Sequence, residues 1–88
     1  MINTQLNAWR EIQATLPKAR RKVYNTIYYG EGLTAFQVAS SLDLPINSIT
    51  GRIRELRDAQ LITIDGTRIN PASDKPVNVY KVVSGRLF

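Results

Sequence analysis

The chain has 88 residues, of which 43% are hydrophobic and 22% charged, as expected for one small globular domain and not for a disordered segment. It contains no cysteine and no histidine, which excludes disulfides, thiolate metal sites and most hydrolase or metalloenzyme mechanisms. Twelve Lys and Arg residues against seven Asp and Glu residues give a net charge of +5, which favours a polyanionic partner such as nucleic acid.

The positive charge lies toward the two ends of the chain. Residues 1–32 carry five basic and two acidic side chains, residues 33–62 three of each, and residues 63–88 four basic and two acidic. No stretch approaches the roughly 18–20 apolar residues of a membrane helix, and Met1 to Gln5 do not open a signal peptide. We therefore expect a cytoplasmic protein that does not enter the membrane.

Two helices are predicted in the first third of the chain. A short helix within residues 1–16 is indicated by apolar residues at spacings of three and four, namely Leu6, Trp9, Ile12 and Leu16. Pro17 suits the first turn of a second helix, which we expect to reach about Tyr29. Its predicted buried stripe is Ala19, Val23 and Ile27. Gly30-Glu31-Gly32 then ends the helix, because glycine tolerates left-handed backbone geometry.

A helix-turn-helix is predicted over residues 34–60. Thr34 and Gln37 have the spacing of a capping box, in which each side chain bonds the backbone N–H of the other residue. The short helix that begins there is broken at residues 43–45. A longer helix follows from about Ile46 to Ala59, with a predicted inner face of Ile49, Ile53 and Leu56.

The last part of the chain predicts a β-hairpin. Residues 61–69 and 77–83 are rich in β-branched and aromatic side chains, and residues 70–76 have the composition of a loop. Asp65-Gly66 is an alternative two-residue turn that would form a separate ribbon. We prefer the long hairpin with Gly66 in a bulge, because the second strand needs a partner of comparable length.

From Leu33 to Ile62 the chain resembles the winged helix-turn-helix family of bacterial and phage DNA-binding proteins. Val38-Ala39 stands where the family has an aliphatic and a small residue, Leu42-Asp43-Leu44 stands at the turn, and the segment from Arg68 to Tyr80 looks like the wing of small phage-type regulators. The resemblance covers residues 17–83. Asp43 and Gln60 replace glycines that are common in the family, at positions that tend to need a positive φ.

The resemblance implies a mainly helical α+β fold, in which helices are followed by a two-stranded β-hairpin wing. We expect one domain over residues 1–88. It would contain an N-terminal helix (1–16), a helical core (17–60) that includes the helix-turn-helix (34–60), a wing hairpin (61–83) and a tail (84–88).

In this family the second helix of the motif enters the major groove, so the face opposite its core residues contacts bases. Glu55 lies on that predicted face together with four candidate base-contacting residues, Asn47, Ser48, Gly51 and Arg52. Asn suits adenine, Arg suits guanine and Ser suits either. Two alternatives stay open: Asn47 and Ser48 could only cap the helix, and Gly51 could be tolerated there without a role.

The DNA backbone contacts implied by the resemblance form a wider set: Thr34, Arg54, Arg57, Arg68, Lys75, Lys18, Arg20 and Arg21. For Arg54 and Arg57 the alternative is a solvated surface in which Glu55 and Asp58 pair with them. The cations at positions 18–22 lie near a helix N-terminus, where positive charge is mildly unfavourable, so either a bound anion or a solvated helix face is consistent with them.

These features predict a sequence-specific double-stranded-DNA-binding protein, either a small phage-type transcriptional regulator or a recombination-accessory protein. We expect no enzymatic activity, no catalytic residue, no metal and no cofactor. The alternative is a winged-helix adaptor that binds protein within a replication, packaging or regulatory complex. The stripe of Leu6, Trp9 and Ile12 belongs either to the core or to the interface of a homodimer.

Overall fold

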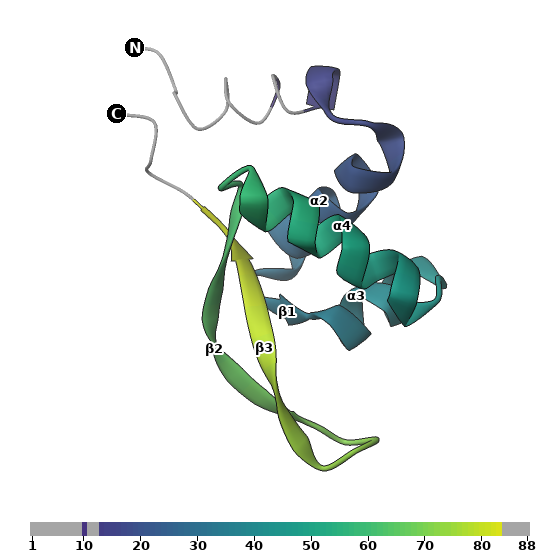
Figure 1. Cartoon of the computed structure of the whole chain (residues 1–88), viewed down its shortest axis with the longest axis vertical. Coiled ribbons are helices and arrows are strands. Elements are labelled where there is room, and N and C mark those ends of the chain that lie inside the picture. Colours follow the sequence, from purple (N-terminus) through teal and green to yellow (C-terminus); the bar gives the residue numbers. More distant parts are fainter. Residues whose placement is uncertain (1–9, 11–12, 84–88) are drawn as a thin grey trace.

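The computed structural model describes Arg10 and residues 13–83. Its elements follow the order α2 (Lys18–Gly30), β1 (Leu33–Thr34), α3 (Ala35–Leu42), α4 (Ile46–Asp58), β2 (Ile62–Asn70) and β3 (Lys75–Val82). The three helices pack at one end, and the β2–β3 hairpin projects away from them as a long wing (Figure 1). The predicted winged helix-turn-helix is confirmed.

The core lies where α2, α3 and α4 meet the base of the wing. Its most deeply buried side chains are Val23, Ile27, Val38, Ile49 and Leu56, each no more than 1% exposed. Burying an aliphatic side chain of this size stabilises the fold by about 1.5–3 kcal/mol. The predicted inner face of α4 is therefore confirmed, and it fixes which side of this helix stays free for a ligand.

The predicted inner stripe of α2 is wrong at one position. Ala19 is exposed, whereas Tyr24 is buried together with Val23 and Ile27. Arg20 lies one helical turn before Tyr24, and its side chain bonds to Glu55 of α4. The first turn of α2 thus meets α4 through an ion pair and not through an alanine.

A capping box and residues with positive φ lie at the helix ends. The capping box at the start of α3 is present, with Gln37 N donating to Thr34 Oγ1 at 3.2 Å and Thr34 N donating to Gln37 Oε1 at 2.9 Å. Asp43 and Gln60 adopt φ values of 55° and 61°, so the expected left-handed positions exist without glycine. At the end of α2 the left-handed residue is Glu31 (φ 56°), followed by Gly32 (φ 108°).

The wing is one long hairpin, and the separate Asp65-Gly66 ribbon is not formed. Ile64 pairs with Tyr80 and Thr67 with Asn78, so two residues of β2 are bulged between these pairs. Gly66 in this bulge has φ 83°, which favours glycine. The connecting turn covers residues 71–74.

The sheet has three strands in the order β1-β3-β2, where the sequence predicted only two. Leu33 pairs with Tyr80 and Thr34 with Val79. Thr34 was expected at the opening of α3, and it serves as the N-cap with φ −80° and ψ 163°. An N-cap residue needs extended backbone geometry, and the same geometry allows β1 to pair with β3.

Candidate nucleic-acid interface

The N-terminal half of α4 presents two polar side chains that have no role in capping the helix. Asn47 and Ser48 are both exposed. The N-cap of α4 is Pro45, and no side chain caps this end. The capping interpretation of Asn47 and Ser48 is therefore wrong, and both side chains lie open for an external partner.

Gly51 follows on the same exposed side of the helix. A Cβ added to Gly51 would meet no heavy atom within 4 Å, so internal packing does not require glycine there. A mid-helix glycine costs about 1 kcal/mol relative to alanine. The space beside Gly51 is therefore open, and another surface can approach the α4 backbone there.

Arg52 and Glu55 are partly exposed, with 40% and 34% of their side chains accessible, and both are engaged in ion pairs. Arg20 of α2 donates from Nε to Glu55 Oε1 and from Nη2 to Glu55 Oε2, both at 3.1 Å. Arg52 forms a second ion pair with the same carboxylate. Arg52 and Glu55 thus lie at the edge of the predicted face that is nearer to α2.

The electrostatics of this cluster favour the charged carboxylate. The hydrogen bonds from Arg20 are the largest effect and lower the pKa of Glu55. Desolvation opposes them, and the neighbouring Arg52 adds a smaller lowering. Glu55 is therefore ionised at neutral pH and compensates part of the charge of two arginines that the sequence assigned to DNA.

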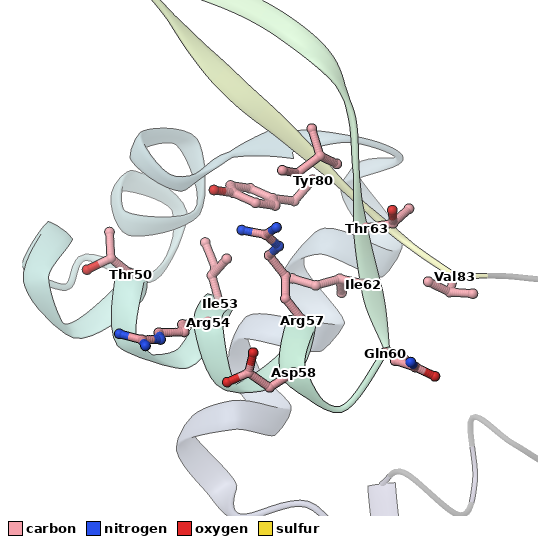
Figure 2. Close-up of a pocket in the computed structure, with 11 residues that line it drawn as sticks. Thr50, Ile53, Arg54, Arg57, Asp58, Gln60, Ile62, Thr63, Tyr80 and Val83 are labelled. Atoms are coloured by element: carbon pink, nitrogen blue, oxygen red, sulfur yellow. The ribbon is translucent and has the colours of Figure 1, made fainter.

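The opposite flank of α4 borders a groove of about 660 Å³, which we call the wing-side groove. Its lining includes Thr50, Arg54, Arg57, Gln60, Thr63 and Tyr80. Figure 2 shows Arg57 directed toward Tyr80 of β3, with Arg54 beside Thr50 on α4. Tyr80, Gln60 and Thr63 were not among the predicted site residues. The end of α4 places Gln60 here, and the pairing of β2 with β3 places Thr63 and Tyr80.

The wing-side flank of α4 carries cations that are free of internal partners. Arg54 and Arg57 are exposed. Within Arg10 and residues 13–83, the ion pairs are Arg20–Glu55 and Arg52–Glu55, so neither Arg54 nor Arg57 is paired with the acidic residue that follows it. The alternative of a salt-bridged surface at these two arginines is therefore not observed.

The wing adds two more cations from the predicted set. Arg68 is exposed, and its Nη1 donates to Gln37 Oε1 at the start of α3, at 2.7 Å. Lys75 is exposed at the first position of β3, where it pairs in register with Asn70. The hydrogen bond fixes Arg68 beside α3 and leaves its other N–H groups available.

Some of the remaining predicted residues form internal hydrogen bonds, and others are exposed. Thr34 is 4% exposed and its hydroxyl caps α3, while Arg21 Nη1 donates to the Gln13 carbonyl at 2.6 Å. Lys18 is exposed at the start of α2. Leu6, Trp9 and Ile12 lie outside the described residues.

Metal and membrane sites were also considered only for the described part of the chain, Arg10 and residues 13–83. Within it, no group of three or more acidic side chains is placed to hold a metal ion. None of its helices combines the length and the apolar character needed to cross a membrane.

Comparisons with known proteins concern the fold. No protein-family model and no curated protein matches the chain. A possible transcriptional regulator from Methanosarcina mazei Go1 has a TM-score of 0.65 at 16% sequence identity, covering 91% of this chain and 67% of that chain. These values agree with a shared winged-helix architecture.

Two structures of MarR give similar results. A cysteine-to-serine mutant of MarR from E. coli has a TM-score of 0.64 at 19% identity, over 91% of this chain and 55% of that one. The Multiple Antibiotic Resistance Repressor, MarR, gives 0.66 at 17% identity, over 92% and 57%. The chain spans a little over half the length of these two proteins. The winged-helix fold is confirmed.

Proposed function

We propose that the protein is a sequence-specific double-stranded-DNA-binding transcriptional regulator. The observation that carries this proposal is the exposed face of α4, which presents unengaged Asn47 and Ser48 and two unpaired arginines beside a projecting wing. The major groove of DNA is about 12 Å wide and admits one α-helix. One structural neighbour is described as a possible transcriptional regulator and another as a repressor, and both support the same function.

In this proposal α4 lies in the major groove. Asn47 and Ser48 contact base edges, and the open backbone at Gly51 allows the groove wall to approach. Arg52 stays in the base-contacting set, but it has to leave Glu55 to reach a guanine. Arg54, Arg57, Arg68 and Lys75 contact phosphates. The engaged side chains of Thr34, Arg20 and Arg21 do not belong to the proposed contacts.

Two experiments test the function. Selection of bound duplexes from random DNA should yield one preferred site, and the genomic position of that site, at promoters or at recombination sites, distinguishes a phage-type regulator from a recombination-accessory protein. Fluorescence anisotropy should then show an affinity that falls steeply with salt. Four phosphate contacts give a slope of log K against log[salt] of about −3 to −4, at ~0.9 per contact. Absence of binding at low salt would favour the protein-binding adaptor.

Operator geometry depends on the assembly state, and we propose a homodimer formed through Leu6, Trp9 and Ile12. Trp9→Ala should then shift sedimentation toward the monomer while the variant stays folded. Lower stability with an unchanged mass would assign this stripe to the core. Two-fold symmetry of the selected DNA sites would support the dimer independently.

A further inference from the structure

Glu55 is the one acidic residue of the described chain that holds two arginines, and both arginines border the proposed recognition face. Arg20 reaches Glu55 from α2 through two hydrogen bonds, and Arg52 reaches it from within α4. Arg52 lies one helical turn after Ser48, on the same flank of the helix. The cluster thus forms the α2-side border of the surface that would face DNA.

The cluster of Arg20, Arg52 and Glu55 adds little to the stability of the fold. The three side chains are between 34% and 40% exposed. Ion pairs at such exposure contribute little to folding, because water screens the charges and long side chains lose entropy when they are held. These ion pairs have a larger effect on which cations a polyanion can reach.

Non-specific DNA binding depends mainly on the number of cations that reach phosphates. Two free arginines beside α4 would add contacts to DNA of any sequence, and they would lower the ratio of specific to non-specific binding. Arg54 and Arg57, on the other flank, have no such restraint. The two flanks of the same helix therefore differ in the charge that they offer.

We propose that Glu55 is a positioning residue that determines specificity by holding Arg20 and Arg52 away from the phosphates of unrelated DNA. Phosphate contacts are then confined to the wing side of α4. On a preferred site, a bidentate contact of Arg52 with guanine compensates for the lost ion pair. This inference rests on the proposed DNA-binding function.

The test compares Glu55→Gln with Glu31→Gln, measured by anisotropy on a short duplex of mixed sequence at several salt concentrations. Glu31 is exposed at the end of α2, so its variant gains the same charge through the same chemical change. Glu55→Gln should steepen the salt slope by about one to two units and raise the affinity roughly tenfold near 0.1 M salt. Glu31→Gln should leave the slope unchanged. Adding Arg20→Gln and Arg52→Gln to Glu55→Gln should restore the wild-type slope.

A double variant tests the same inference even if Glu55→Gln does not fold. Arg20→Gln combined with Arg52→Gln, in a chain that retains Glu55, should bind the mixed duplex with the wild-type slope and lose affinity only on the selected site. A slope reduced by one to two units would show that both arginines already contact phosphates, and this overturns the inference. Equal slopes for folded Glu55→Gln and Glu31→Gln also overturn it. If the wild type binds no duplex at low salt, the proposed function itself fails.

Discussion

Arg68 of the wing donates a hydrogen bond to the side chain of Gln37, whose oxygen also accepts the backbone N–H of Thr34. One amide oxygen therefore joins β2, α3 and the N-cap that precedes α3. This contact sets the distance between the wing and the helix-turn-helix. In the proposed function, this contact joins two parts of the surface that would contact one major groove and its neighbouring backbone.

A double-mutant cycle measures this link. Gln37→Ala and Arg68→Ala should each destabilise the fold, and the double variant should lose about 0.5–1 kcal/mol less than the sum of the two, because the second change removes a bond that is already absent. Urea denaturation gives the three free energies of unfolding. Purely additive effects would show that Arg68 and Gln37 are not coupled in solution.

Base contacts and phosphate contacts should respond differently to substitution. Asn47→Ala should cost about 1–3 kcal/mol on the selected site and little on unrelated DNA, because an amide distinguishes one base pair from another. Lys75→Ala should weaken both kinds of DNA equally and reduce the salt slope by about one unit.

Circular dichroism provides the control for this comparison. Asn47 does not cap α4, so Asn47→Ala should leave the helix content unchanged. The assignment of roles would be inverted if Lys75→Ala relaxed specificity while Asn47→Ala weakened all DNA alike.

The left-handed residues give a prediction about stability. Glu31→Gly should stabilise the fold by about 0.5–1 kcal/mol, because a glutamate at φ 56° is strained and glycine is not. Asp43→Gly, at φ 55°, should change stability much less, since aspartate tolerates this region. Thermal and urea unfolding of the two variants test the difference. Equal gains at both sites would contradict the explanation.

The Glu55 cluster predicts a pH dependence of stability. Because its arginine partners lower the pKa of Glu55, the ionised carboxylate stabilises the folded state above the ordinary value of 4.5, and this contribution is lost as the pH falls through the lower folded-state value. The melting temperature of the wild type should therefore exceed that of Glu55→Gln near neutral pH, and the gap should close on acidification. A gap that is constant with pH would show that the pairing does not form.

The parts of the structure that the sequence predicted correctly depend on neighbouring residues. The capping box joins Thr34 to a residue three positions away, and the positive φ values at Asp43 and Gln60 follow from the geometry of a helix end. Gly66 also predicted the bulge from a property of the residue itself, because glycine readily adopts a positive φ. The core face of α4 followed from its periodicity, because that pattern reports burial directly.

The parts that the sequence did not predict depend on contacts between distant segments. Arg20 and Glu55 are 35 residues apart, and no spacing rule connects them. Periodicity gives the angle of a residue around a helix but not the neighbour that lies beside it, so it did not predict that Arg52 and Arg20 are both paired with Glu55. The strand β1 has two residues, which is too short for an alternating pattern to be recognised.

The bulge at residues 65–66 also protects the molecule against association through its sheet. β2 is an outer strand of the order β1-β3-β2, and seven consecutive residues of it, 63–69, are exposed. A regular strand in that position would offer unpaired backbone groups to a strand from another molecule. The bulge, which contains the charged Asp65, interrupts this edge, and the charge of Arg68 follows shortly after it. Deleting one bulged residue should make this edge regular and favour association between molecules.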